Sequence, residues 1–493
     1  MSEPLIFEMS RPGRRAWSLP ECDVPVPAAD ELLPAAFLAK TRPTLPELSL
    51  RDLVGHFTRL SQKNFCVDTH FYPLGSCTMK FNPKVNDVLA SLAGFTEAHP
   101  YAPELAPGIV EVLASLGEVL CEITGMDAVS LQPSAGAHGE LTGLLMVQAY
   151  HASRGGRRKF ALVPDSAHGT NPASCTLAGL EVREVKSGRD GLVDMKSLRK
   201  ELTRDVAVMM ITNPNTLGLF EKNVLEISRE LHDAGALLYL DGANLNAIMG
   251  VTRPGDFGVD VMHLNLHKTF STPHGAGGPG AGPVAVKNTL TPFLPTPVVR
   301  RDASGRALLD NDRPHSIGRV RTFHGNVGVL VRAYAYIRTL GAKGLREAAE
   351  LAVLNANYLL KKLVGRFPVP YGERCMHEFV ATGEPLLRHG VRTLDVAKRL
   401  IDFGVHPPTV YFPLIVKEAL MVEPTETESK ETLDRFADIM LQIAEEAEKS
   451  PELLKTAPNT TEFSRFDEVA AARSPRLTWE PPAPATPWLP FEK

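Results

Sequence analysis

Short runs of hydrophobic residues alternate with longer amphipathic stretches through the middle of the chain. Short apolar runs bounded by polar residues are typical of buried strands, whereas apolar positions spaced by three and four are typical of helices. Strands and helices alternating in this way predict an α/β fold, with a mostly parallel sheet flanked by helices and joined by right-handed crossovers. The predicted strands span residues 160–163, 181–185, 206–211, 236–240 and 259–266, and the predicted helices span 48–61, 109–124, 132–151 and 224–234.

The pattern changes after about residue 290, where long helical runs predict a smaller C-terminal α+β domain. The first residues and the tail from Ser474 are rich in proline. Because the first segment cannot bury a core of its own, we expect an arm lying over the body or over a partner. The tail is expected to pack down as an extension. The later helices are predicted over 327–340, 343–364 and 429–449, and the division is an arm (1–60), a large domain (61–325) and a small domain with the tail (326–493).

Composition narrows the classes of function. The 493 residues carry a net charge of −4, so nucleic-acid binding has no support from a basic field. No apolar run reaches the roughly 18 residues that a membrane span needs, and the N-terminus lacks the hydrophobic core of a signal peptide. The six cysteines are scattered without a CxxC pair, which favours reduced thiols in a cytoplasmic protein over a disulfide framework or a zinc site.

Two charged residues stand at the ends of successive predicted strands. Asp241 follows the run 236–240, and Lys268 follows the run 259–266, with a glycine-rich loop over 275–282 further on. In an open parallel sheet the carboxyl ends of the strands line one crevice, so both side chains would face it. A carboxylate for a pyridinium nitrogen and an amine for an aldehyde are what pyridoxal 5′-phosphate (PLP) requires. On this pair alone, a turn aspartate and a solvated lysine are the more ordinary interpretation.

Other predicted element ends carry polar groups as well. His168 follows the strand over 160–163 and could stack on a planar ring, and Asn213 follows the strand over 206–211 and could bond a ring hydroxyl. Small residues from Ser134 to Gly136 open a helix, where free N–H groups and the helix dipole favour a phosphate. Each such residue alone is more often part of a turn, but four convergent strand ends favour a binding site.

An irregular segment over residues 64–84, NFCVDTHFYPLGSCTMKFNPK, is dense in groups that do chemistry. Functional groups gathered on a loop favour a site over a spacer. From composition alone, the segment could equally be an ordinary polar loop on the surface. The groups in question are His70, Tyr72, Ser76, Cys77, Thr78 and Lys80.

Several strings, in order along the chain, match a known family: YPLGSCTMKFNPK, QPSAGAHGE, DSAHGTNPAS, TNPNTLGLFE, LDGANLNAI, HLNLHKTFSTPHGAGGPGAGP and EPTETESKETLD. Together they closely resemble the glycine cleavage system P-proteins, PLP-dependent glycine dehydrogenases (decarboxylating). The resemblance runs from about Asn64 to the tail. The chain is similar to the half of the family that keeps the lysine, so it resembles the second (β) subunit of the split form. Ala276, where another glycine is expected, is a small departure that would tighten the loop.

The resemblance implies the type I, aspartate-aminotransferase-like fold of PLP enzymes and assigns roles to individual residues. Lys268 would form the Schiff base with PLP, Asp241 would pair with the pyridinium nitrogen, and His168 would stack on the ring. The other cofactor-binding residues would be Ser134, Ala135 and Gly136 at the phosphate with help from His267, together with Thr170, Asn213 and Ala243.

The resemblance also implies partners. Glycine would lose CO₂, and its aminomethyl group would pass to the lipoyl arm of the H-protein, with residues 70–80 helping to line the entrance. A companion first subunit (α) without the lysine would complete an α2β2 assembly, in which Thr322 and Gly325 could reach a neighbour's phosphate site. Arg374 and His377 are candidates for binding the glycine carboxylate. We expect no metal, nucleic acid or membrane among the ligands.

Three alternatives make different demands on the sequence. Another type I PLP enzyme, such as an aminotransferase or a cysteine desulfurase, would share Asp241 and Lys268 but would not explain the string over 71–84. A non-catalytic scaffold subunit would predict loss of the lysine or the aspartate, and both are present. A metal hydrolase using His263, His267 and His274 fails on spacing, because this segment is predicted to be a strand running into a loop.

Overall fold

The computed structural model describes residues 3–41, 45–99, 102 and 104–478. The described residues fall into two compact units, one made of the chain up to Cys66 together with the segment from Thr460, and one spanning Val67–Asn459. Most of the tail that was predicted to pack down lies outside the described residues. Within them, no helix combines the length and hydrophobicity that crossing a membrane requires.

The first unit is built on α3 (Leu50–Gln62), which confirms the helix predicted over 48–61. Ser49 caps it by accepting a hydrogen bond from the Asp52 amide. Leu48 and His56 are the only buried residues among the described ones of this unit, so it has almost no core of its own. The shorter elements are α1 (Ile6–Met9), α2 (Ala29–Leu32), η1 (Ala35–Phe37) and α16 (Glu468–Arg473).

A seven-stranded sheet forms the centre of the second unit. All neighbouring strands run parallel except β7, which is antiparallel to both of its neighbours, so the predicted mostly parallel sheet is confirmed. The five predicted strands are all present, whereas the three-residue β1 and β7 were not predicted because their apolar runs are too short to stand out. The order is β1 (Ala128–Ser130), β7 (Val284–Val286), β6 (Val261–Leu264), β5 (Leu237–Gly242), β4 (Val206–Thr212), β2 (Phe160–Pro164) and β3 (Glu181–Val185).

Hydrophobic layers cover both faces of this sheet. In β5, Leu238 and Leu240 belong to one buried cluster, and Leu237 and Tyr239 to another on the opposite face. A strand buried on both faces reads as a continuous apolar run, which is why β4 and β5 are visible in the sequence. The surrounding helices are α4 (Lys84–Ala90), α5 (Ala93–Thr96), α6 (Pro107–Thr124), α7 (Gly136–Ser153), α8 (Thr170–Leu177), α9 (Met195–Glu201), α10 (Val224–Asp233) and α11 (Leu266–Thr269), with η2 (Leu245–Ala247), η3 (Pro254–Phe257) and η4 (Asn288–Phe293).

The predicted strand over 259–266 is too long. Only Val261–Leu264 pair in the sheet as β6, and the chain then turns into the short helix α11, which carries Lys268. Periodicity cannot separate a buried strand from a short buried helical turn that follows it. The hairpin of β8 (Val298–Arg301) and β9 (Ala307–Asp310) was also not predicted.

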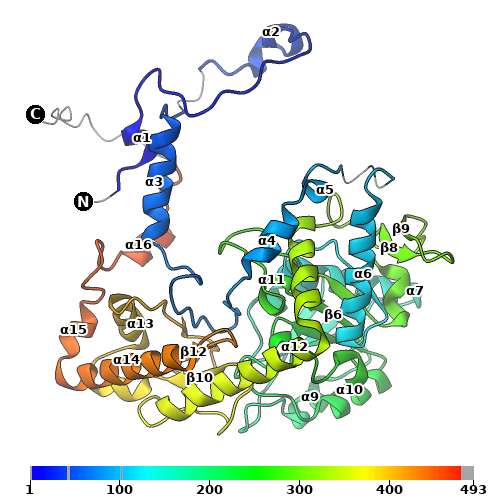
Figure 1. Ribbon diagram of the computed structural model, residues 1–493. Coiled ribbons are helices and arrows are strands. Elements are labelled where there is room, and N and C mark those ends of the chain that lie inside the picture. Colours follow the sequence, from blue (N-terminus) through cyan, green and yellow to red (C-terminus); the bar gives the residue numbers. More distant parts are fainter. Residues whose placement is uncertain (1–2, 42–44, 100–101, 103, 479–493) are drawn as a thin grey trace, which may run out of the picture. The chain divides into compact units, whose positions relative to one another are not determined.

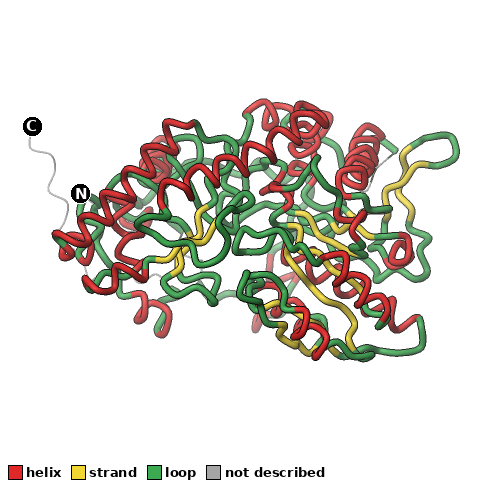
Figure 2. The backbone as a smooth tube through the Cα atoms, turned by 90° about the horizontal axis from the view of Figure 1, so that it is seen from below, coloured by secondary structure: helices red, strands yellow, loops and turns green. Residues whose placement is uncertain are grey.

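Helix α12 (Val327–Leu363) leads from the large sheet to a smaller, three-stranded one (Figure 1). Gly341 has a non-helical conformation with φ 60°, so the two helices predicted over 327–340 and 343–364 are present as two segments meeting at this residue. The small antiparallel sheet has the order β10 (Phe379–Thr382), β12 (Ala419–Val422), β11 (Thr409–Val410), and Figure 2 shows it apart from the large sheet. It packs with η5 (Glu384–His389), α13 (Thr393–Asp402), α14 (Lys430–Lys449) and α15 (Pro451–Lys455).

Candidate active site

A cavity of about 210 Å³ lies at the carboxyl ends of β4, β5 and β6, where the strand pattern predicted a crevice. The chain brings both predicted chemical groups to it, the Asp241 carboxylate from the end of β5 and the Lys268 amine from α11. The predicted site residues that line it are Gly136, His168, Thr170, Asp241, Ala243, His267 and Lys268. Lining residues that sequence reasoning did not single out as cofactor ligands are Ser76, Ala137, Glu140, Thr212, Thr216, Asn244, His263 and Asn265.

Lys268 is half-buried, and its amine donates a hydrogen bond of 2.8 Å to the Ser76 carbonyl. The glycine-rich loop after it packs tightly on neighbouring segments. A Cβ at Gly282 would lie 2.0 Å from the Ala135 carbonyl oxygen, and one at Gly280 would lie 2.7 Å from His267 Nδ1. These two glycines are therefore required for close approach. Ala276, the departure from the expected glycine, takes a left-handed conformation with φ 62°.

Asp241 is buried, and both of its carboxylate oxygens have partners. The Asn171 side-chain amide donates to Oδ2 (2.9 Å), the Ala243 amide donates to Oδ1 (2.9 Å), and His263 Nε2 lies 3.2 Å from Oδ1. Burial alone would raise the pKa of Asp241, but the charge and hydrogen bond of His263 and the two amides outweigh it and lower that pKa. The carboxylate is therefore held ionised in the cavity wall.

The pKa of His263 is shifted in the opposite direction. Burial alone would lower its pKa, but the charge and the hydrogen bond of Asp241 raise it. Sequence reasoning considered this residue only as a metal ligand, because it lies inside an apolar run that gives no sign of a charged partner. The one clue in the sequence was the place of His263 in its strand, because His263 stands opposite Asp241 in the pairing of β6 with β5.

His168 lies beside Thr170 at the start of α8, with Nδ1 2.9 Å from the Thr170 hydroxyl oxygen. That hydroxyl donates to Oε1 of the buried Glu140 (2.8 Å), whose other oxygen accepts a hydrogen bond from Ser174 (2.8 Å). Burial lowers the pKa of His168, which favours a neutral ring. A neutral, flat imidazole held from behind by its neighbours is suited to stacking on a planar ligand.

The predicted phosphate residues open α7, but they do not all reach the cavity. Gly136 lines it, whereas Ser134 and Ala135 are not among its lining residues, and the Ser134 hydroxyl lies 3.2 Å from His138 Nδ1. His267 lines the cavity, and burial, followed by the charge of Lys268, lowers its pKa to about 4. The N-terminal turn of α7 and a neutral His267 are thus the groups available for a phosphate.

Asn213 is placed differently from the prediction that it lines the ring. Its side-chain oxygen accepts a hydrogen bond from the Glu221 amide (2.9 Å), and it is not among the lining residues. The flanking Thr212 and Thr216 line the cavity instead. Asn213 misses the cavity because the chain turns there, at the end of β4, so that Thr212 and Thr216 face the cavity in its place.

The candidates for the glycine carboxylate also lie away from the cavity lining. Arg374 is exposed, and His377 is fully buried, with a pKa lowered by burial to about 3. A neutral imidazole offers no positive charge to a carboxylate. Thr322 is exposed, and neither it nor Gly325 lines the cavity of its own chain, so their service to a neighbour stays a prediction.

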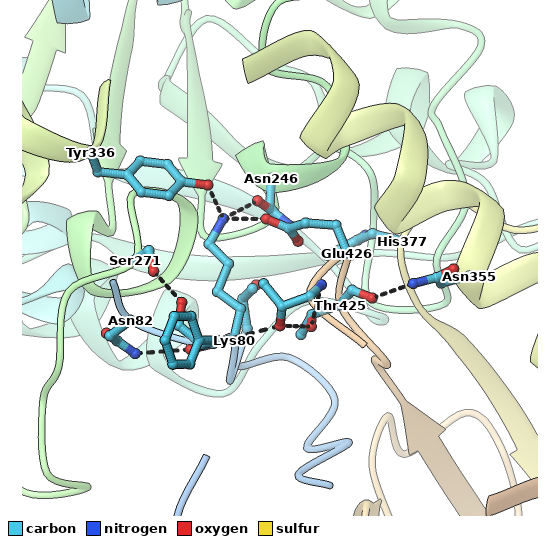
Figure 3. A network of polar contacts seen from close by, with 12 residues as sticks. Lys80, Asn82, Asn246, Ser271, Tyr336, Asn355, His377, Thr425 and Glu426 are labelled. Carbon is cyan, nitrogen blue, oxygen red and sulfur yellow. Dashed lines mark hydrogen bonds and ion pairs between the residues drawn. The ribbon is translucent and has the colours of Figure 1, made fainter. Parts of the chain in front are cut away.

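The segment dense in functional groups is anchored by glutamates that lie beside the strands of the small sheet. The Ser76 amide donates to Glu378 (2.8 Å), and the Thr78 hydroxyl donates to Glu423. Further on, the Lys80 amine donates to Glu426 (2.7 Å), and Figure 3 shows it pointing among Glu426, Asn246 and Tyr336. No local pattern in the sequence marks these contacts, because the glutamates follow some 300 residues later.

The residues present fit PLP. The cavity places an amine, an ionised carboxylate, a neutral imidazole and a helix N-terminus around one space, which is the donor set that this cofactor uses. Two buried oxygens in the lining, Thr212 Oγ1 and Asn265 Oδ1, have no hydrogen-bond partner among the described residues. Buried polar atoms are normally paired, so unpaired ones in a cavity wall indicate a polar ligand.

Comparison with known proteins agrees with this geometry. The family described as glycine cleavage system P-protein matches residues 28–382, and the glycine dehydrogenase C-terminal domain matches residues 348–460. A Caldanaerobacter subterraneus protein named "Probable glycine dehydrogenase (decarboxylating) subunit 2" is 59% identical over 477 residues, which are 96% of this chain and 98% of that protein.

Solved structures share the fold. A glycine decarboxylase (P-protein) of the glycine cleavage system, in inhibitor-bound form, superposes with a TM-score of 0.71 at 21% identity, covering 84% of this chain and 95% of that one. A cysteine desulfurase from Thermococcus onnurineus gives a TM-score of 0.58 at 15% identity, with 77% and 95% covered. These likenesses confirm the type I PLP-enzyme fold predicted from the sequence. Through its sequence matches, the chain belongs to the glycine cleavage system P-protein family.

Proposed function

We propose that this chain is the PLP-carrying second subunit of a glycine dehydrogenase (decarboxylating), which releases CO₂ from glycine and passes the aminomethyl group to the lipoyl arm of the H-protein. The observation that carries the proposal is the pairing of Lys268 and Asp241 in one cavity of a chain from this family. A type I likeness alone would equally suit a cysteine desulfurase, but at 15% identity it concerns the fold only.

Bound PLP supplies an electron sink for the electrons left on the α-carbon when CO₂ departs. The Lys268 amine is the group that would attach the cofactor when glycine is absent. The Asp241 carboxylate would hold a proton on the ring nitrogen, because Asn171, Ala243 and His263 keep it ionised. The His168 ring would cover one face of the cofactor ring, and the first turn of α7 with His267 would hold the phosphate.

Partners follow from the family. A companion first subunit without the lysine would complete the enzyme as an α2β2 assembly. The arm offers a surface for it, since its apolar side chains Trp17, Leu19 and Phe37 are 72%, 80% and 77% exposed. Exposed apolar groups on a segment with almost no core favour a permanent partner. The six cysteines are scattered without a CxxC pair, which supports a reducing, cytoplasmic setting.

The cofactor assignment is tested by reducing the loaded protein with borohydride and mapping the modified peptide by mass spectrometry. PLP fixed on Lys268 is expected, and Lys268→Ala should lose both the fixed cofactor and glycine-dependent CO₂ release. Lys343→Ala, at a side chain 91% exposed on α12, is the matched control and should retain both. Cofactor fixed on another lysine would refute the assignment.

The partner assignment is tested by size-exclusion chromatography and activity assays of the chain alone and with its companion subunit. Co-elution and lipoyl-dependent CO₂ release only in the mixture are expected. Full activity of the chain alone would refute the split-subunit proposal and leave the PLP chemistry standing. Release of CO₂ from glutamate, or of sulfur from cysteine, in place of glycine turnover would favour another type I PLP activity.

A further inference from the structure

The segment from Pro73 to Lys80 passes beside β12 of the small sheet and turns at Gly75 and Ser76. Leu74 forms an antiparallel bridge with Val422 of β12, and the amide of Glu423 donates to the Pro73 carbonyl (3.4 Å). Beyond this bridge, every second residue contacts a glutamate of the small domain, as described above for Ser76, Thr78 and Lys80. A segment hydrogen-bonded to three separate glutamates, two of them through its side chains, is held in place beside the cavity.

Ser76 is the member of this segment that faces Lys268. Its amide donates to Glu378 Oε2 at 2.8 Å, and its carbonyl accepts a hydrogen bond from the Lys268 amine, also at 2.8 Å. The residue has φ 67°, a left-handed conformation that is disfavoured for any residue with a Cβ. Such a conformation persists only where its surroundings impose it.

The constraint comes from both sides of the residue. Before it, a Cβ at Gly75 would lie 2.2 Å from Met421 Cγ, and the Gly75 carbonyl accepts a hydrogen bond from Thr409 (2.8 Å). After the turn, Glu378 accepts the hydrogen bond of the Ser76 amide. Glu378 is fully buried and accepts a second hydrogen bond from the Asn244 side chain (3.2 Å). Asn244 in turn donates to the Pro214 carbonyl (2.9 Å), so Glu378 is tied to the end of β4 as well as to Ser76.

We propose that Glu378 is a positioning residue, which fixes Ser76 in its left-handed conformation so that the Ser76 carbonyl holds the free amine of Lys268. The free amine is the form that Lys268 has whenever glycine occupies its place on the cofactor. Holding that amine nearby keeps it aligned for its return and away from the substrate. This inference rests on the proposed function, because it takes Lys268 to be the lysine that attaches PLP.

The geometry makes a definite demand on the side chain at residue 378. The Ser76 amide needs a hydrogen-bond acceptor, and a side chain at residue 378 must be as long as glutamate to place one there. Glutamine keeps one such oxygen, aspartate is shorter by one methylene, and leucine removes the acceptor altogether. Losing the acceptor for a buried backbone N–H is costly, so Ser76 would relax toward a negative φ and turn its carbonyl away from Lys268.

The test labels amines with trace acetic anhydride in the full chain, purified with its companion subunit and freed of cofactor. Labelling at each lysine is read by mass spectrometry. In Glu378→Leu the labelling rate of Lys268 should rise about ten-fold, because an amine without its hydrogen-bond partner is freer to react. Glu378→Gln should stay within about three-fold of the wild type, which is rescue by the conservative variant. Glu384→Leu, at an exposed glutamate of the same domain, is the matched control.

The remaining lysines separate positioning from a general loosening of the fold. If Glu378 acts only by positioning Ser76, its loss raises the labelling rate of Lys268 alone. A general loosening of the fold would raise the labelling rate of the buried Lys80 as well. In the loaded enzyme, Glu378→Leu should lower kcat for glycine while KM changes by less than about three-fold. If Glu378→Leu does not fold, Glu378→Asp replaces it, with the same expected increase at Lys268.

Two outcomes overturn the inference: unchanged Lys268 labelling in Glu378→Leu or Glu378→Asp, or equal increases at Lys268 and Lys80. Failure of the proposed function is distinguishable from both. Borohydride reduction of the loaded wild type would then fix PLP at a lysine other than Lys268. If PLP is fixed at Lys268 in every variant and the labelling does not change, only the positioning role of Glu378 is lost.

Discussion

Asp241 and His263 form a buried ion pair between neighbouring parallel strands. The two residues stand opposite each other in the pairing of β5 with β6, and His263 Nε2 lies 3.2 Å from Asp241 Oδ1. Their side chains are 3% and 1% exposed, so water does not screen the two charges and each charge is balanced mainly by the other. The Tyr239 hydroxyl lies 3.2 Å from the second ring nitrogen, which leaves both nitrogens of His263 partnered.

Replacing His263 by leucine should leave the Asp241 carboxylate buried without its counter-charge. Removing one partner of a buried pair typically costs about 3–5 kcal/mol, and PLP binding should weaken as Asp241 becomes protonated. Urea unfolding and PLP titration measure the two effects. His232→Leu is the matched control, because His232 pairs with Asp260 at 2.7 Å but is 40% exposed, and it should cost no more than about 1 kcal/mol. Equal losses in the two variants would contradict the role assigned to burial.

Asp241→Asn should retain bound PLP and lose decarboxylation by several orders of magnitude. A neutral amide cannot hold a proton on the ring nitrogen, and an unprotonated ring is a poor electron sink. The measurement is single-turnover CO₂ release from glycine, with PLP content determined by absorbance. The exposed Asp233→Asn at the end of α10 controls for the loss of a carboxylate. Near-normal turnover in folded Asp241→Asn would remove this role.

The sequence was informative where one short stretch determines the structure. Strands β4 and β5 are buried on both faces and so read as unbroken apolar runs ending in polar residues. Asp241 and Lys268 were found because each follows such a run. Helix α11 escaped prediction, because a single helical turn of apolar and basic residues continues the pattern of the strand before it.

Contacts between distant parts of the chain could not be predicted in the same way. Glu378 and Glu423 contact the segment around Ser76 and Thr78 only in the folded chain, so no local pattern marks them. His263 is hidden within an apolar strand, and its role depends on the register between β5 and β6. Burial and pairing of charges are properties of the folded chain, whereas periodicity is a property of the local sequence.

His168→Ala should keep the attachment of PLP to Lys268 and weaken cofactor affinity moderately. Stacking on an aromatic ring is worth about 0.5–1.5 kcal/mol, or between about two-fold and ten-fold in Kd. Fluorescence titration with PLP measures the affinity, and CO₂ release measures turnover. The exposed His315→Ala is the control. Complete loss of turnover with PLP still bound would indicate a proton-transfer role instead of stacking.

Lys80→Met should destabilise the fold more than removal of an exposed ion pair does. The Lys80 side chain is 1% exposed, and its partner Glu426 is 7% exposed, so the variant leaves a buried carboxylate without its counter-charge (Figure 3). A loss of about 3–5 kcal/mol is expected, and Lys80→Met combined with Glu426→Gln should recover part of it. Lys84→Met removes a pair with Asp68 in which the lysine is 59% exposed, and it should cost no more than about 1 kcal/mol. Urea unfolding midpoints decide between these values.

His377 should make the protein sensitive to acid. Its side chain is fully buried with no hydrogen-bond partner on either nitrogen among the described residues, and burial lowers its pKa from the usual 6.5 to about 3. Below pH 6.5 the unfolded chain binds a proton there and the folded chain does not, so this residue reduces stability as the pH falls from 6.5 toward 3. The slope for one proton is about 1.4 kcal/mol per pH unit.

His377→Leu should therefore remove about 2 kcal/mol of the stability change between pH 6.5 and pH 5. Near pH 7.5 the variant should be about as stable as the wild type, because the imidazole makes no hydrogen bond among the described residues that an apolar side chain of similar size would break. Urea unfolding at pH 5, 6 and 7.5 measures the difference, with His315→Leu as the control for loss of an exposed histidine. A stability difference between His377→Leu and the wild type that does not vary with pH would mean that His377 takes up a proton in the folded state.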